Sequence, residues 1–293
     1  MAIYEDQLAR WARAPSETEE GKCQNAVTRI TKAIRVKFGD RVSIFLQGSY
    51  RNRTNVRLDS DVDTVVRLND IYFGDINAMS EADKERYRQI PNSEFTYSQF
   101  KRDVESVLKD TFGSNLVERH KRCIRVLKDS QWANADVLPC FVHKRFRSFG
   151  ETSAEGIGFL TDDGQYVSSF PEQHYENGVS KNKTADGYKS AVRILKNVRN
   201  VLLDQNTISQ KDMPSFFLEC LVWNIPDIYF SEDTYRDATK SIISKIWNDM
   251  GDPKRANEYA EVSDLMWLFR GNSTRTHQQA RDFIQRAWNF IGY

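Results

Sequence analysis

The sequence predicts an α+β protein, with strands and helices in its first part and a helical lobe in its second. Short apolar runs rich in β-branched residues stand at residues 42–46, 61–68, 123–127 and 133–141, each bounded by polar or turn-forming residues. From residue 184 onward, apolar residues recur instead at helical spacing. A sheet with helices, followed by a group of packed helices, is therefore the expected architecture.

The first element is a helix that precedes the first strand. Ser16-Glu-Thr-Glu19 is a capping box, apolar residues recur at helical spacing from Val27 to Phe38, and Gly39 ends the run. We expect this helix to brace both lobes of the protein. The chain is divided into N-terminal helices at residues 1–38, a sheet-containing core at residues 39–165 and a helical lobe at residues 166–293.

The segments between and after the strands are assigned in the same way. A short charged helix begins near Ser80, and an amphipathic helix carries apolar residues from Phe100 to Leu108. Residues 149–184 are rich in Gly, Ser, Asn and Asp without clear periodicity, so we expect a connection between the lobes that forms part of the substrate cleft. The helices expected beyond it are Thr184–Leu203, Ser215–Asn224, Ser231–Met250, Tyr259–Phe269 and Thr274–Ile291.

The most informative motif is Gln47-Gly48-Ser49, which ends the first strand and is followed by Asp61 and Asp63. Glycine lets the backbone approach a ligand closely, and backbone amides at the start of the next turn point toward an anion such as a triphosphate. Along a strand, Asp61 and Asp63 project from the same face. Two converging carboxylates need a cation, and such hard oxygen ligands suit Mg²⁺.

A third carboxylate, Asp136, stands within the apolar run 133–141, which is expected to form a β-hairpin with the run 123–127. A lone carboxylate in an apolar strand is costly to bury unless it is paired or bound to a metal. A salt bridge to Arg125 is one explanation. The metal role is preferred, because Asp61 and Asp63 already require a partner on a neighbouring strand.

Composition narrows the classes of function. The chain has 293 residues, 40% of them hydrophobic, and a net charge of +1 from 42 basic and 41 acidic side chains. This balance argues against an extended nucleic-acid surface, because such binding rests on phosphate neutralisation by Lys and Arg. Small charged substrates are therefore favoured over long RNA.

Cell compartment is inferred from what the sequence lacks. No apolar run approaches the length of a membrane span, and the N-terminus has neither the basic nor the apolar region of a signal peptide. The four cysteines are far apart and indicate neither a zinc site nor a disulfide framework. We therefore expect a soluble monomer in a reducing cytoplasm.

These residues resemble those of the nucleotidyltransferases with a polymerase β-like core, and among them the bacterial cGAS/DncV-like nucleotidyltransferases of anti-phage defence. The resemblance covers most of the chain and rests on Gln47-Gly48-Ser49, Thr54, Asp61-Val-Asp63 and Asp136-Val-Leu-Pro139. It implies a mixed-sheet palm joined to a helical lobe, with the active site in the cleft between them. It also implies that Asp61, Asp63 and Asp136 are catalytic and hold two divalent ions, Mg²⁺ or also Mn²⁺.

The resemblance further implies nucleotide-binding roles for Lys196, Ser215 and Phe216, beside that of Gln47-Gly48-Ser49. In the family, a lysine and a serine of the helical lobe hold the donor triphosphate, and an aromatic residue after that serine stacks on the donor base. Helical spacing by itself only places Lys196 on a basic face, for which a solvated surface is the simpler explanation. For Ser215, which follows Pro214, the simpler explanation is a helix N-cap.

The expected reaction is two-metal nucleotidyl transfer, in which a ribose hydroxyl attacks the α-phosphorus of a nucleoside triphosphate and pyrophosphate leaves. As the resemblance implies, repeated transfer closes a cyclic di- or trinucleotide, a second messenger that reaches an effector in antiviral signalling. ATP is expected among the substrates. A template-independent RNA-tailing enzyme, a small-molecule nucleotidyltransferase and a catalytically dead nucleotide-binding scaffold remain open.

Overall fold

The computed structural model describes residues 3–14, 17–56, 61–271 and 273–293, which pack into two compact units. The sheet unit comprises the described parts of Ser16–Tyr50 and Ser60–Pro171. The helical unit comprises the described parts of Met1–Pro15, Arg51–Asp59 and Glu172–Tyr293. The division into residues 1–38, 39–165 and 166–293 stays a prediction, as does the bracing of both lobes by the first long helix.

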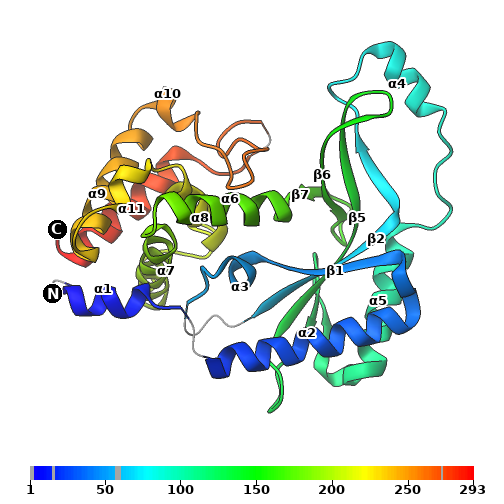
Figure 1. The fold of residues 1–293 in the computed structure, drawn as a ribbon, viewed down its shortest axis with the longest axis horizontal. Helices are drawn as coiled ribbons and strands as arrows, with labels where there is room; N and C mark the ends of the chain where they lie inside the picture. The colour runs from blue at the N-terminus through cyan, green and yellow to red at the C-terminus, as the bar shows by residue number, and fades with distance from the viewer. Residues whose placement is uncertain (1–2, 15–16, 57–60, 272) are drawn as a thin grey trace. The chain divides into compact units, whose positions relative to one another are not determined.

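A mixed sheet forms the centre of the sheet unit. Within the described residues, its strands run in the order β1-β2-β5-β4-β3, and β6 pairs with both β5 and β7 (Figure 1). β2 is antiparallel to β1 and parallel to β5, which confirms the predicted α+β class and the mixed sheet. The strands are β1 (Val42–Gln47), β2 (Val62–Asp75), β3 (Val117–Arg119), β4 (Ile124–Val126), β5 (Ala135–Ser148), β6 (Glu151–Leu160) and β7 (Tyr166–Ser169).

Two long helices, α2 (Glu17–Phe38) and α5 (Tyr97–Phe112), lie side by side along this sheet (Figure 1). The apolar stripe predicted for α2 is buried, and it joins the apolar residues of α5 and of the strands in one core. A capping box begins α5, where Thr96 accepts from the Gln99 amide and Gln99 accepts from the Thr96 amide. The capping box predicted at Ser16–Glu19 lies outside the side chains that the structure describes. The remaining helices here are α3 (Gly48–Asn52) and α4 (Glu81–Arg88).

The predicted strands are confirmed, with one difference. Asp61 directly precedes β2 instead of lying within it. Residues 149–184, in which the sequence shows no clear periodicity, form β6, β7 and the helix α6 (Pro171–Thr184), and their part in a substrate cleft stays a prediction. Glycines in β6 obscure its strand pattern in the sequence. A Cβ on Gly156 would clash with the Ser169 carbonyl oxygen, so the close approach of β7 requires glycine there.

Helix α6 was missed for a different reason, which is its weak amphipathic pattern: the residues it buries are His174 and Gly178. It begins the main helical run of the helical unit. The other helices of this unit are α1 (Glu5–Ala12), α7 (Tyr188–Asp204), α8 (Ser215–Trp223), α9 (Tyr235–Met250), α10 (Pro253–Ala256) and α11 (His277–Ile291), with a 3₁₀ turn at Asp227–Phe230.

Helix α8 lies in the core of the helical unit, because its residues from Phe217 to Val222 are all buried. α7, α9 and α11 pack around the same core, and α1 packs against α7 (Figure 1). The helix predicted at Tyr259–Phe269 was wrong. That segment forms turns and an isolated bridge between Ala260 and Trp267, and Asp264 adopts a φ of +58°, which a right-handed helix excludes.

The described residues include no helix with the length and apolar character needed to cross a membrane.

Candidate functional site

One row of side chains crosses the sheet at the end of β1. Gln47 on β1 pairs with Asp63 on β2, and Asp63 pairs in turn with Asp136 on β5. Asp136 also pairs with Arg125 on β4. Residues that pair directly across neighbouring strands project from the same face of a sheet. The register therefore gathers two of the predicted carboxylates and a guanidinium on one face, and Asp61, two residues before Asp63, joins them through the contacts of Arg125.

The guanidinium of Arg125 binds two of these carboxylates at once. Its Nε and Nη2 donate to the two oxygens of Asp136, at 2.8 and 2.9 Å. The same Nη2 donates to Oδ2 of Asp61 at 2.9 Å, and the Asn134 side chain donates to Oδ1 of Asp61 at 3.0 Å. The bonds to Asp136 raise the pKa of Arg125 above its ordinary value, so the guanidinium stays charged. Asp61, Asp63 and Asp136 are called the three-carboxylate cluster below.

Gly48 shapes the cluster from the side of the Gln47-Gly48-Ser49 turn. Its φ of +67° lies in the left-handed region that favours glycine. A Cβ at this position would lie 2.1 Å from Oδ2 of Asp63. The glycine is required twice, because it permits the turn into α3 and because it leaves room for the Asp63 carboxylate against the backbone.

The donor set of the cluster fits a hard divalent cation, because Mg²⁺ and Mn²⁺ prefer carboxylate oxygens. In the part of the chain that the structure describes, no three or more His, Cys, Asp or Glu side chains are arranged as a metal site. The guanidinium of Arg125 pairs with both Asp61 and Asp136. Cys123 lies beside Asp136, and burial, followed by the charge of Asp136, raises its pKa to about 12, so it is a neutral thiol near pH 7.

Lys196 lies in a buried polar network of the helical unit. Its ammonium, with a side chain only 4% exposed, donates to Glu219 at 2.8 Å and to the Thr54 hydroxyl at 3.1 Å. His174 is hydrogen-bonded to the other oxygen of Glu219 at 3.0 Å. Burial acts to raise the pKa of Glu219, but the charges and hydrogen bonds of Lys196 and His174 outweigh it, and the net result is a pKa well below the ordinary value.

The basic face predicted for the helix 184–203 is therefore not a solvated surface. Arg193 on α7 is also buried and donates to the carbonyl oxygens of Ala12 and Arg53, each at 2.6 Å. Helical periodicity predicts that Arg193 and Lys196 face solvent. Their charged groups instead form hydrogen bonds between segments of the helical unit. The role of Lys196 in triphosphate binding stays a prediction.

Ser215 and Phe216 begin helix α8. Pro214 is the N-cap, so Ser215 is the first helical residue and is half-buried, not the cap itself. The ring of Phe216 is 37% exposed, and the guanidinium of Arg275 lies 5.1 Å from its centroid. An exposed aromatic face beside a cation suits stacking on a base, but this role also stays a prediction.

The predicted site residues fall into two sets, one in each unit. Gln47, Gly48 and the three-carboxylate cluster belong to the sheet unit, and Lys196 and Phe216 belong to the helical unit. Sequence reasoning named Arg125 only as an alternative partner of Asp136, and it missed Asn134 and Glu219. The hairpin register was the signal for Arg125, because it opposes Asp136 directly. The sequence holds no comparable signal for Glu219, which looks like one polar residue in an apolar helix.

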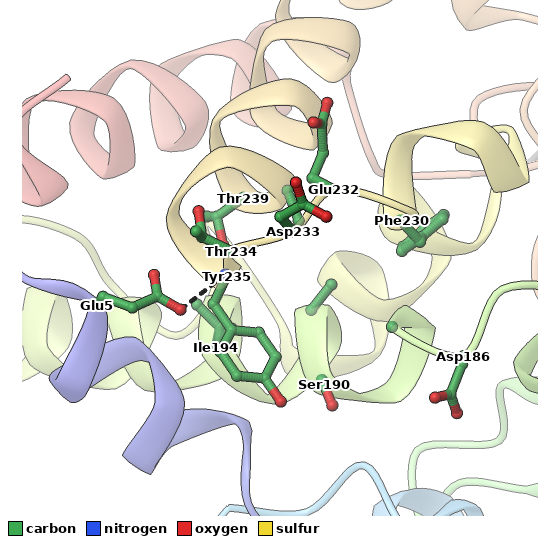
Figure 2. Close-up of a pocket in the computed structure, with 13 residues that line it drawn as sticks. Glu5, Asp186, Ser190, Ile194, Phe230, Glu232, Asp233, Thr234, Tyr235 and Thr239 are labelled. Carbon is green, nitrogen blue, oxygen red and sulfur yellow. Dashed lines mark hydrogen bonds between the residues drawn. The ribbon is translucent and has the colours of Figure 1, made fainter.

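A separate cavity of about 430 Å³ lies in the helical unit (Figure 2). The Glu5 carboxylate accepts hydrogen bonds there from the backbone amides of Tyr235 and Arg236, at 2.9 and 2.8 Å. Asp186 and the adjacent pair Glu232-Asp233 also line it. Four carboxylates around one cavity repel a triphosphate, so this cavity is not a candidate for the nucleotide.

Comparisons with known proteins find relatives that match along the whole chain. Residues 176–292 match the family model of the cGAS/DncV-like nucleotidyltransferase C-terminal helical domain. The chain is 47% identical to a cyclic dipurine nucleotide synthase of Elizabethkingia meningoseptica, over 100% of both chains. It is 33% identical to a cyclic dipyrimidine nucleotide synthase of Cecembia lonarensis, again over 100% of both chains. The structure of the Elizabethkingia meningoseptica CdnE cyclic dinucleotide synthase with GTP and Apcpp superimposes with a TM-score of 0.85 at 44% identity, over 99% of this chain and 100% of that one.

Proposed function

Because the chain belongs to the cGAS/DncV-like nucleotidyltransferases, and is therefore a nucleotidyltransferase, we propose that it joins nucleoside triphosphates into a cyclic dinucleotide. The observation that carries the proposal is the row that sets Asp63 and Asp136 beside Gly48 on one face of the sheet. Relatives that match over their whole length are named as synthases of cyclic dinucleotides, which favours two transfers over the three that a cyclic trinucleotide needs.

The three-carboxylate cluster is the proposed catalytic centre, and its oxygens hold two divalent ions, Mg²⁺ or in its place Mn²⁺. When held by these carboxylates, such ions would supply neutralisation of phosphate charge and a lowered pKa for the attacking ribose hydroxyl. Asp63 is fixed against the backbone of Gly48, and Asp136 is fixed by the register of β5 with β2. The strand register thus places these two proposed ligands on one face of the sheet before substrate binds.

Nucleotide-binding roles are proposed for six residues. Gln47, Gly48 and Ser49 are proposed to bind the phosphates of the donor, where the tight turn at Gly48 brings backbone and phosphate close. Lys196 and Ser215 are proposed to bind triphosphate, and Phe216 is proposed to stack on the donor base. A ribose hydroxyl attacks the α-phosphorus, the bond to the bridging oxygen breaks, and pyrophosphate leaves. A second transfer within the linear intermediate closes the ring.

The proposed identity of the bases is based on the relative from Elizabethkingia meningoseptica, which is 47% identical to the chain. That relative is named a cyclic dipurine nucleotide synthase, so ATP and GTP are the proposed substrates. The product acts as a second messenger in anti-phage signalling and reaches an effector in the cytoplasm, while the enzyme works as a monomer. The near-neutral net charge of +1 supports a small nucleotide product over a long RNA.

Product analysis tests this function. The purified protein is incubated with Mg²⁺ or Mn²⁺ and with each pair of α-³²P-labelled nucleoside triphosphates, then treated with phosphatase and separated by chromatography. A small phosphatase-resistant product from ATP and GTP is expected. A ladder of long RNA indicates a tailing enzyme, a label carried by a small added acceptor indicates a small-molecule nucleotidyltransferase, and no product indicates a dead scaffold. Each of these outcomes rejects the proposal.

A further inference from the structure

Arg125 stands in an unusual position for a cation, inside the group of carboxylates that is proposed to bind metal. Its side chain is 30% exposed, so the guanidinium is partly removed from water. The fork of the guanidinium matches the two oxygens of Asp136, and one of its nitrogens also reaches Asp61. Such bidentate, charge-assisted bonds are among the strongest that side chains form.

The oxygens that Arg125 binds belong to two of the three proposed metal ligands. Both oxygens of Asp136 and Oδ2 of Asp61 accept from Arg125, and Oδ1 of Asp61 accepts from Asn134. All four oxygens of these two carboxylates are thus engaged by donors. A divalent ion at the same oxygens would lie within a few ångströms of a guanidinium of like charge, and at that distance the repulsion between them is strong.

We propose that Arg125 is an internal counter-cation that holds Asp61 and Asp136 together in the nucleotide-free protein and opposes the binding of a divalent ion until it is displaced from one of them. This inference rests on the proposed function, because it takes the three-carboxylate cluster as the metal site. It goes beyond that function by assigning to Arg125 a positioning role that sets the metal affinity. Asn134 holds Asp61 in place when Arg125 is displaced, because its neutral amide donates to Asp61 without repelling a divalent ion.

Binding of Mn²⁺ to the nucleotide-free protein tests the role without relying on catalysis. The free ion is counted by electron paramagnetic resonance, for the wild type and for Arg125→Gln. Removing the positive charge is expected to tighten Mn²⁺ binding by about 10-fold or more. The variant is also expected to melt at a lower temperature than the wild type in EDTA and to gain more from added Mn²⁺. Unchanged or weaker Mn²⁺ binding by Arg125→Gln would overturn the inference.

Arg119→Gln is the matched control. Arg119 lies on the neighbouring strand β3 and pairs with Ile124, so it projects from the face of the sheet opposite to Arg125. It binds Asp162 and Glu105 instead of the cluster. Its substitution removes the same charge and is expected to leave Mn²⁺ affinity unchanged. Arg125→Lys keeps the charge but loses the fork, so an intermediate affinity is expected, and this variant serves if the glutamine variant does not fold.

Asp63→Asn separates failure of this inference from failure of the proposed function. Arg125 donates to Asp61 and Asp136, so Asp63→Asn removes a proposed ligand while both of those carboxylates remain. If Asp63→Asn abolishes Mn²⁺ binding but Arg125→Gln does not tighten it, the inference fails and the metal site stands. If Mn²⁺ binds equally well with and without the Asp63 carboxylate, the proposed metal site fails, and the inference fails with it.

Discussion

At position 48 the backbone and a side chain of the cluster share the same space. The φ of +67° at Gly48 and the approach of the Asp63 carboxylate are independent reasons for glycine. A left-handed conformation costs a residue with a Cβ about 1–2 kcal/mol. The contact with Asp63 adds a second effect, which acts on the position of a proposed metal ligand and not only on stability.

Gly48→Ala is therefore expected to abolish nucleotidyl transfer, whereas Gly150→Ala is not. Gly150 has a φ of +83°, but a Cβ there would meet nothing within 4 Å. Both variants are expected to lose about 1 kcal/mol of unfolding free energy from backbone strain. Transfer rates and urea denaturation of the two variants measure the difference. Equal activity in Gly48→Ala and Gly150→Ala would show that Asp63 does not depend on the space left by Gly48.

The buried ion pair of Lys196 and Glu219 is expected to contribute to the stability of the helical unit. Glu219→Gln leaves the buried ammonium without its counter-charge, which is expected to cost about 3 kcal/mol of unfolding free energy. The double variant Lys196→Met with Glu219→Gln removes both charges and is expected to recover most of that loss. Chemical denaturation of the two single variants and the double variant gives the coupling energy. Additive losses would contradict a coupled pair.

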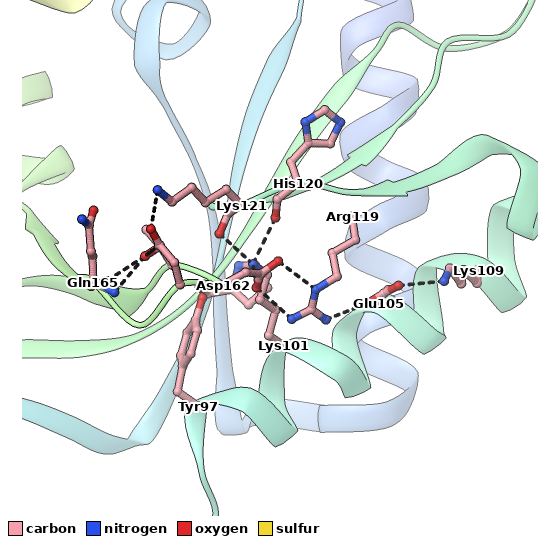
Figure 3. A network of polar contacts seen from close by, with 12 residues as sticks. Tyr97, Lys101, Glu105, Lys109, Arg119, His120, Lys121, Asp162 and Gln165 are labelled. Carbon is pink, nitrogen blue, oxygen red and sulfur yellow. Dashed lines mark hydrogen bonds and ion pairs between the residues drawn. The ribbon is translucent and has the colours of Figure 1, made fainter.

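Helix α5 is tied to the turn between β3 and β4 by a buried lysine (Figure 3). The ammonium of Lys101 donates to the carbonyl oxygens of His120 and Lys121 at 3.2 and 3.1 Å, and to Asp162 at 2.8 Å. Arg119 also binds Asp162, so one carboxylate joins α5, β3 and the segment after β6. This network fixes the edge of the sheet next to the strand that carries Arg125.

Lys101→Met is expected to destabilise the protein by about 1–3 kcal/mol, because it removes the hydrogen bonds that the buried ammonium donates to two carbonyl oxygens and to Asp162. Lys109→Met, on the same helix, is the control. Lys109 is half-exposed and forms an i,i+4 pair with Glu105, whose loss is worth about 0.3–0.5 kcal/mol. Urea denaturation measures both, and a loss in Lys101→Met no larger than that in Lys109→Met would reject the structural role of this network.

The same network predicts a pH dependence. The hydrogen bonds from Arg119 are the main cause that lowers the pKa of Asp162 to about 2. A lowered pKa stabilises the fold above the ordinary aspartate pKa, and this contribution is lost as the pH falls from about 4 toward 2. The carboxylate is 35% exposed, so water screens the pair and about 1 kcal/mol is expected at pH 7. The stability difference between wild type and Asp162→Asn should shrink between pH 5 and pH 3; a constant difference would contradict the assignment.

Strands and helices with a clear period could be predicted from the sequence, and the others could not. The alternation in β2 and the apolar stripe of α2 arise from burial on one face, which a single sequence records directly. β6 was missed because Gly156 and Gly158 interrupt the apolar pattern of the strand. Glycine is needed at both positions, because a Cβ there would clash with neighbouring atoms. The predicted helix at Tyr259–Phe269 does not form, because the apolar residues there pack through turns and an isolated bridge.

The proposed site divides in the same way. Asp61, Asp63, Asp136 and Gly48 could be named because a strand order and a turn glycine leave a local pattern. The ion pair between Arg125 and Asp61 could not be predicted, because these residues are 64 positions apart and meet only through the register of three strands. Tertiary contacts, and not local propensity, decide which cation meets which carboxylate.

For the whole molecule, both the family and the net charge favour small nucleotides over long RNA as substrates. The chain matches full-length cyclic nucleotide synthases and carries a net charge of +1, which does not favour a long polyanion as substrate. The sheet unit supplies the proposed carboxylates and the phosphate-binding turn, and the helical unit supplies the residues proposed to hold triphosphate and base. Within this division, the carboxylates are the residues proposed to be catalytic.

The most direct test compares wild type with Asp63→Asn in the synthesis of a phosphatase-resistant product from α-³²P-labelled ATP and GTP with Mg²⁺. Circular dichroism and thermal melting confirm that the variant is folded. The wild type is expected to release pyrophosphate and to retain the labelled phosphate in a small cyclic product. Asp63→Asn is expected to slow this reaction by more than about 100-fold, since a metal ligand is lost. A folded Asp63→Asn variant with the wild-type rate would contradict the assignment of the three-carboxylate cluster as the catalytic centre.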